Sequence, residues 1–132
     1  MSTFFLARWA PQLLSVFRIV VALLFLEHGT AKLLGFPHLD MFANLPLMSM
    51  AGIAGVLELV GGLLLVLGLF TRPVAFILSG EMAVAYFIAH APHGFFPLLN
   101  QGEGAVFYCF AFLYLAAAGG GLWSVDRLRN AA

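Results

Sequence analysis

Charged side chains are scarce in this chain. Only 9% of its 132 residues are Asp, Glu, Lys or Arg, whereas 63% are hydrophobic. Soluble domains usually contain about 25% charged residues, so this composition excludes an ordinary water-soluble domain. The formal net charge is zero and the sequence has no basic run. Because nucleic-acid-binding domains carry basic patches, we expect no nucleic acid among the partners of the protein.

Cysteine is nearly absent, and motifs for metals and cofactors are missing. Cys109 is the only cysteine, which excludes an intrachain disulfide and a Cys-x-x-Cys redox pair. It lies in an apolar run, as expected of a small buried side chain. The Glu-x-x-His motif of four-helix di-iron proteins does not occur in the sequence. We therefore expect no metal site and no intrinsic cofactor.

The sequence is instead rich in long apolar runs. A bilayer core requires about 20 apolar residues per helix, and four segments approach that length: residues 13–34, 48–70, 74–91 and 105–123. The first run exceeds the roughly 7–15 apolar residues of a signal peptide, so we expect an uncleaved span. Because short connections favour antiparallel neighbours, residues 1–132 are predicted to form one all-α membrane domain, an up-down-up-down four-helix bundle.

The positions of Lys and Arg predict the orientation of this bundle. Arg8 precedes the first span, Arg72 lies between the second and third, and Arg127 and Arg129 follow the fourth. The other two connections contain neither Lys nor Arg. The positive-inside rule therefore places both termini in the cytoplasm. Lys32, near the outer end of the first span, is the one residue that disagrees.

The apolar segments nevertheless contain ionisable side chains. Each charge at the centre of a membrane helix costs about 2.5–3.5 kcal/mol on insertion scales, so such groups normally face a protein interior or a water-filled cavity. Each predicted span has at least one carboxylate in it or next to it. The candidate residues for ligand binding or proton exchange are Arg18, Glu27, His28, Lys32, Glu58, Glu81, Asn100 and Glu103.

Most of these groups are predicted to lie in the outer half of the bundle. Arg18 is the exception, about 13 Å closer to the cytoplasm than Glu27 at ~1.5 Å per residue. Gly55 and Gly62 share a helix face with Glu58, and small residues let helices approach closely in lipid. We therefore expect Glu58 to pack against a neighbouring helix. Glu27 points away from Arg18 and is expected to meet another helix, a loop or a second subunit.

Counting charges favours proton exchange. The four glutamates exceed Arg18 and Lys32 by two negative charges if all groups ionise, and burial disfavours that excess. We predict that at least one glutamate is protonated at neutral pH, or that His28 or His90 is cationic. A purely structural interpretation stays open, because polar side chains also hydrogen-bond helices together in lipid, for about 0.6 kcal/mol per contact. Arg18 alone is better explained as a structural counter-ion.

Four stretches resemble the DoxX family of small membrane proteins. They are RIVVALLFLEHGTAKLLGF at 18–36, GVLELVGGLLLVLGLFTRPVA at 55–75, NQGEGAVFYCFAFLYLAAAG at 100–119 and GGGLWSVD at 119–126. The resemblance covers nearly the whole chain after residue 12 and implies a multi-pass, four-helix protein of bacterial inner membranes. The family takes its name from a subunit associated with quinone-linked thiosulfate oxidation. Gln101 stands where the family's Asn-Gly-Gly-Glu pattern has a second glycine.

The resemblance assigns no catalytic role to any residue. The motif positions that transfer are Arg18, His28, Gly29, Lys32, Glu58, Gly62, Glu81, Asn100 and Glu103. Our leading hypothesis is a redox-associated subunit that binds a quinone or a similar lipophilic molecule in the bilayer. Lys32 or His28 would donate a hydrogen bond to its carbonyl, Glu58 or Glu81 would exchange protons, and a redox partner protein would supply electrons.

Two alternatives remain open at this point. The first is a transporter of a small solute or of protons, although the small size and the lack of an inverted repeat count against it as a monomer. The objection from size applies to a monomer and not to a homo-oligomer. The second is a non-catalytic assembly or scaffold subunit of a membrane oxidoreductase, in which the charges only fix helix packing.

Overall fold

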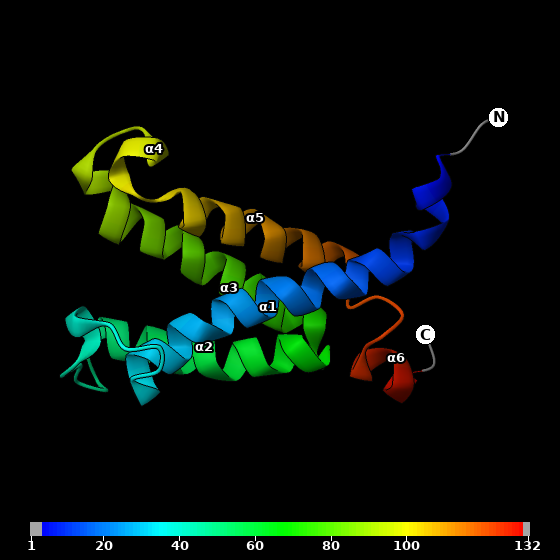
Figure 1. Ribbon diagram of the computed structural model, residues 1–132, viewed down its shortest axis with the longest axis horizontal. Helices are drawn as coiled ribbons and strands as arrows, with labels where there is room; N and C mark the ends of the chain where they lie inside the picture. The colour runs from blue at the N-terminus through cyan, green and yellow to red at the C-terminus, as the bar shows by residue number, and fades with distance from the viewer. Residues whose placement is uncertain (1–3, 131–132) are drawn as a thin grey trace.

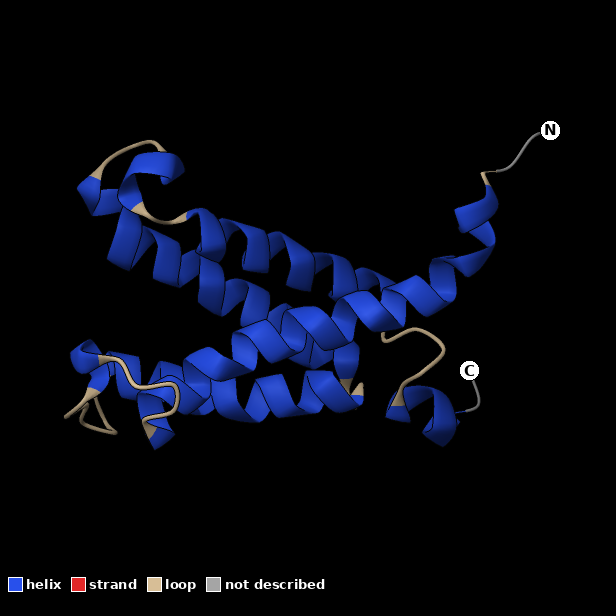
Figure 2. Cartoon of the chain, viewed as in Figure 1, coloured by secondary structure: helices blue, strands red, loops and turns tan. Residues whose placement is uncertain are grey.

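A computed structural model describes residues 4–130 as helices joined by short connections (Figure 1). No strand occurs in this part of the chain (Figure 2). The four long helices are α1 (Ala10–Leu34), α2 (Met50–Leu67), α3 (Thr71–Ala85) and α5 (Glu103–Ala118). The short elements are η1 (Phe5–Trp9), η2 (Asp40–Phe42), the π-helical η3 (Tyr86–His90), η4 (Ala91–His93), α4 (Pro97–Asn100) and α6 (Val125–Asn130).

Successive long helices run in opposite directions, so the molecule has two distinct ends (Figure 1). We call the end that carries η1, α6 and the α2–α3 turn the terminal end. The opposite end carries the connections over residues 35–49 and 91–102, and we call it the loop end (Figure 1).

The predicted all-α membrane protein is confirmed, with three candidate spans. Helical stretches of 30, 18 and 23 residues, over Phe5–Leu34, Met50–Leu67 and Thr71–His93, are long and apolar enough to cross a bilayer. The fourth predicted segment is shorter than expected, because α5 has 16 residues and ends at Ala118. Gly119 then adopts a φ of 83°, a conformation that favours glycine and stops the helix.

The long helices pack as two pairs. α1 lies along α2 and α3 lies along α5, whereas the contacts between α2 and α3 are fewer and those between α1 and α5 fewer still. The pairs separate toward the loop end (Figure 1). Where they meet, Phe25 of α1 packs against Phe112 of α5 with ring centroids 4.8 Å apart. The core consists of Ala22, Phe25, Leu65, Ala75, Leu78, Met82, Phe112 and Leu115.

Glycines bring α1 and α2 into close contact. A Cβ atom on Gly29 would lie 2.5 Å from the backbone nitrogen of Leu59, so only glycine fits there. A Cβ on Gly55 would lie 3.1 Å from the Cβ of Lys32. This close approach leaves Glu58 only 2% exposed. The expectation that Glu58 packs against a neighbouring helix is therefore confirmed.

Candidate functional site

An ion pair joins the two closest helices near the loop end. The Lys32 Nζ atom of α1 lies 2.8 Å from Oε1 and 2.9 Å from Oε2 of Glu58 in α2. The lysine side chain is 14% exposed and the glutamate 2%. Lys32 also lies 5.6 Å from the centroid of the Phe42 ring. The close packing at Gly55 thus places a charged pair in the interior of the α1–α2 interface.

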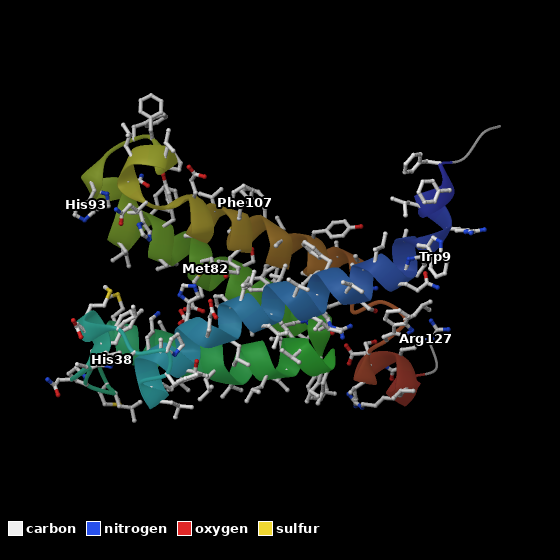
Figure 3. The ribbon with its side chains drawn as sticks, viewed as in Figure 1. Trp9, His38, Met82, His93, Phe107 and Arg127 are labelled. Atoms are coloured by element: carbon white, nitrogen blue, oxygen red, sulfur yellow. The ribbon has the colours of Figure 1, made fainter. Side chains whose placement is uncertain are left out.

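Glu81 of α3 adds a second carboxyl group to this pair. Glu58 and Lys32 are its charged neighbours. Both carboxyl oxygens of Glu81 are buried, and within residues 4–130 neither accepts a hydrogen bond from an N–H or hydroxyl donor. The Glu58 carboxyl is close enough to share a hydrogen bond with Glu81 when one of the two carries a proton. Met82, the next residue, lies between the two helix pairs (Figure 3). Two carboxyl groups and one ammonium are neutral as a set only when one carboxyl carries a proton.

His28 and Glu27 lie on exposed parts of α1. The His28 ring packs edge-on against Tyr108 of α5, with ring centroids 5.8 Å apart. Tyr108 is half-buried against the core. Glu27 forms no ion pair in the described part of the chain. These two residues are therefore placed beside the α1–α5 contact and outside the Lys32–Glu58 pair.

Asn100 organises the connection that precedes α5. Its Nδ2 donates to the Tyr86 hydroxyl at 3.1 Å and to the Gly94 carbonyl at 2.9 Å, and its Oδ1 accepts from the Gly102 N–H at 2.8 Å. The Asn100 carbonyl is 3.1 Å from Nδ1 of His90. The Asn100 side chain, 5% exposed, is thus fully used within the fold. Glu103 follows as the exposed first residue of α5.

Arg18 lies far from these groups, toward the terminal end. It is 1% exposed, and its guanidinium donates to backbone carbonyls and to no carboxylate in the structure described. The acceptors are the carbonyls of Leu65 at 2.8 Å, Val66 at 3.3 Å and Trp123 at 2.9 Å, together with that of Gly120. Arg18 therefore ties the end of α2 to the segment that follows α5.

Asp126 performs a related structural role that sequence reasoning missed. Its carboxylate accepts hydrogen bonds from the backbone N–H groups of Phe70 at 2.7 Å and Thr71 at 2.9 Å, at the start of α3. Partial burial would raise its pKa, but the hydrogen bonds from Thr71 and Phe70, with the nearby Arg129, hold the pKa of Asp126 below its ordinary value. The only sequence signal is its place in the GGGLWSVD motif.

The eight predicted site residues therefore lie at several separate locations in the structure. Lys32, Glu58 and Glu81 come together between three helices. Within residues 4–130, no three His, Cys, Asp or Glu side chains are grouped so that they could hold a metal ion. The residues placed elsewhere are Arg18, Glu27, His28, Asn100 and Glu103.

Two cavities lie away from this cluster. One, of about 270 Å³, is an apolar groove between α2 and α3. The other, of about 980 Å³, lies at the terminal end and is lined by three arginines among other residues. The first suits a lipid chain or a neighbouring helix, and the second is wide enough for a small polar molecule.

Comparisons with known proteins found a matching family model and bacterial relatives. The family model described as DoxX matches residues 13–91. An uncharacterized protein of Haemophilus influenzae is 49% identical over 126 residues, which cover 92% of this chain and 94% of that protein. The Escherichia coli inner membrane proteins YphA and YqjF are 33% and 29% identical, over 89% and 87% of this chain and 90% of each relative. No solved structure matches the chain.

Proposed function

The chain belongs to the DoxX family and is a multi-pass protein of the bacterial inner membrane, and on that basis we propose that it binds the carbonyl head of a quinone or a similar lipophilic molecule. The binding site would be the cluster of Lys32, Glu58 and Glu81. The protein would then act as a redox-associated subunit, with a redox partner protein as the source or acceptor of electrons.

The buried carboxyl of Glu81 is the observation that carries this proposal. Its two oxygens are removed from solvent, and in the described chain the Glu58 carboxyl is the group that can share a hydrogen bond with them, with no N–H or hydroxyl donor beside it. A buried polar group left unpaired costs about 1–3 kcal/mol, and a redox or catalytic role is one of the explanations for a group of this kind in a native protein. A ligand with a hydrogen-bonding head group would remove that cost. Glu81 belongs to the α3–α5 pair, whereas Lys32 and Glu58 belong to the α1–α2 pair. A ligand that contacts all three residues would therefore lie between the two helix pairs.

The cluster has the groups that quinone chemistry requires. The Lys32 ammonium has three N–H donors and is shared between two oxygens of Glu58, so one donor is free for a quinone carbonyl. Reduction of a quinone consumes two electrons and two protons, one proton for each carbonyl oxygen. Glu81 and Glu58 would pass those protons, and the partner protein would pass the electrons. Oxidation of the quinol would reverse each transfer.

In the bilayer, we place α5 as a fourth span beside α1, α2 and α3. Its 16 residues extend about 24 Å at ~1.5 Å per residue, and the adjoining residues 97–102 and 119–123 would complete the crossing. Both termini would be cytoplasmic, because the connections over residues 35–49 and 91–102 contain neither Lys nor Arg. The Lys32–Glu58–Glu81 cluster would then lie in the outer half of the membrane.

Mass spectrometry of an organic extract tests this proposal. The full chain, purified in mild detergent, should release about one quinone per chain, and the Glu58→Gln and Glu81→Gln variants should release much less. Glu103→Gln is the matched control, because it removes an exposed carboxyl at the loop end outside the cluster. Phospholipid alone, extracted equally from all four proteins, would overturn the proposal.

That negative result would leave the two alternative functions to be separated. A scaffold subunit predicts that the paired change Lys32→Met with Glu58→Gln restores the stability lost in either single variant, with no loss of cell function. A transporter predicts flux of protons or a solute into proteoliposomes. Arg18 does not favour transport, because four of the five N–H groups of its guanidinium donate to backbone carbonyls.

A further inference from the structure

A second site lies at the terminal end, where the geometry points to a cavity that binds a phosphate group, carried by an anionic phospholipid or by a small soluble phosphate compound. The cavity has a volume of about 980 Å³ and lies between the first turn of α1, the α2–α3 turn, the end of α5, and α6. Small-molecule sites usually enclose about 300–1,000 Å³. None of the residues of the Lys32–Glu58–Glu81 cluster lines it.

The charged lining of this cavity is strongly cationic. Arg72, Arg127 and Arg129 line it, and Asp126 is its only acidic residue, so three positive charges and one negative charge leave a net charge of +2. The Asp126 carboxylate is already engaged by two backbone N–H groups. Within residues 4–130, none of the three guanidinium groups forms an ion pair. Their charge is therefore available for an anion.

Two of these arginines are held in place by the fold. Arg72 donates from Nη1 to the Ala117 carbonyl at the end of α5, and its other N–H donors have no acceptor among residues 4–130. The guanidinium of Arg129 lies 4.8 Å from the centroid of the Phe70 ring. Arg127 lies between α6 and the start of α1 (Figure 3). Guanidinium groups bind phosphate oxygens in a planar, two-pronged geometry. A phosphate group has three strong acceptor oxygens, so it can engage three arginines around one space.

Apart from the charged residues, the lining combines the polar Thr71, Ser124 and Asn130 with apolar side chains, and this mixture fits a lipid headgroup at the end of the spans. Pro11 and Leu14 of α1, Tyr114 of α5 and Leu122 contribute to it. Basic pockets between membrane helices bind the phosphates of anionic lipids. A phospholipid would place its phosphate among the arginines and the start of its acyl chains against these side chains. A soluble organic phosphate would use the arginines alone.

Native mass spectrometry of the full chain in detergent tests the site with phosphatidylglycerol as the probe. Arg127→Gln and Arg129→Gln should each weaken retention of this lipid by about tenfold, the usual scale for one charge-assisted contact. Arg8→Gln is the matched control, because Arg8 is an exposed arginine at the same end that does not line the cavity. It should change retention less than about twofold. Phosphatidylcholine should be retained weakly by every variant.

Competition with sn-glycerol 3-phosphate distinguishes the two sources of the phosphate. Displacement of phosphatidylglycerol at millimolar concentration identifies a soluble phosphate site, whereas retention without displacement identifies a lipid site. Equal loss of retention in Arg8→Gln and Arg127→Gln would show surface charge without a site and would overturn the inference. So would equal retention of the two lipids. Circular dichroism should show unchanged helix content, because Arg127 and Arg129 are exposed.

Discussion

Replacing Arg18 with methionine should release the C-terminal segment from the helices that hold it. The substitution removes the hydrogen bonds that one guanidinium donates to the carbonyls of Leu65, Gly120 and Trp123. The Leu65 carbonyl keeps a bond from the Gly68 N–H and the Gly120 carbonyl one from the Ser15 hydroxyl. Each lost hydrogen bond from a charged donor costs about 1.5–3 kcal/mol, and the remaining donors, with water at the partly buried Trp123 carbonyl, would lower the sum. Methionine fills part of the same volume, so we expect a net loss of about 3–5 kcal/mol, less than the full sum for three such hydrogen bonds.

Two readouts measure this effect. Reversible unfolding of the full chain in mixed micelles with increasing dodecyl sulfate gives the loss of free energy. Trypsin cleavage after Arg127 or Arg129 reports detachment of α6 and should become faster. Arg18→Lys keeps the charge with fewer, differently placed donors and should lose less. Arg8→Met changes an exposed arginine and should have no effect. A loss below about 0.5 kcal/mol in Arg18→Met, within the range of surface substitutions, would refute the reasoning.

Three further substitutions test other parts of the fold. Because the pKa of Asp126 is lowered in the folded protein, its carboxylate stabilises the fold above about pH 4 and stops doing so as pH falls through the lower folded pKa. Unfolding measured between about pH 3 and 7 should show that Asp126→Asn is less stable than the wild type by about 1 kcal/mol at neutral pH. This difference in stability should vanish in acid. Gly29→Ala places a Cβ 2.5 Å from the Leu59 nitrogen and should lower the free energy of unfolding by about 1–3 kcal/mol in the same micelle assay. The Cβ of Gly80→Ala meets nothing within 4 Å, so this control should be neutral or slightly stabilising. Equal effects of the two substitutions would contradict the packing described. Gln101 has a φ of 62°, so Gln101→Gly should raise stability by about 0.5–1 kcal/mol, a gain that thermal unfolding can detect and that Gln101→Ala should lack.

Hydropathy was sufficient to predict the helical membrane fold. In lipid, each backbone N–H and C=O must be paired within the segment, which leaves helices as the solution for long apolar runs. The spacing of Gly55 and Gly62 around Glu58 also predicted correctly that this carboxylate packs against a neighbour. The end of α5 was predicted too late, because the apolar character of the segment continues beyond the glycines that stop the helix.

The partners of Arg18 and Asp126 were beyond a sequence-based prediction. Arg18 binds backbone carbonyls 47 and 102 residues away, and every residue has such a carbonyl, so no residue type marks the acceptor. Asp126 caps a helix that begins 55 residues before it. Only the packing of α6 against the α2–α3 turn brings these groups together.

The sequence marked the ionisable residues of the candidate site but not their pairing. Which carboxylate meets Lys32 depends on the rotation of each helix about its axis, and apolar side chains all round the spans leave that rotation undetermined. Asn100 was predicted to lie in a connection, but its structural role was not. An asparagine two residues before a glycine commonly accepts from the backbone N–H at that distance, as Asn100 does from the Gly102 N–H.

Titration of the purified protein with a short-chain quinone tests the central claim most directly. The wild-type chain and Glu103→Gln should bind it with equal affinity, and Glu81→Gln should bind at least about tenfold more weakly, as expected when one buried hydrogen bond to a charged or protonated partner is lost. Equal affinity of all three proteins, or no binding by any of them, would contradict the assignment of the Lys32–Glu58–Glu81 cluster as a quinone site.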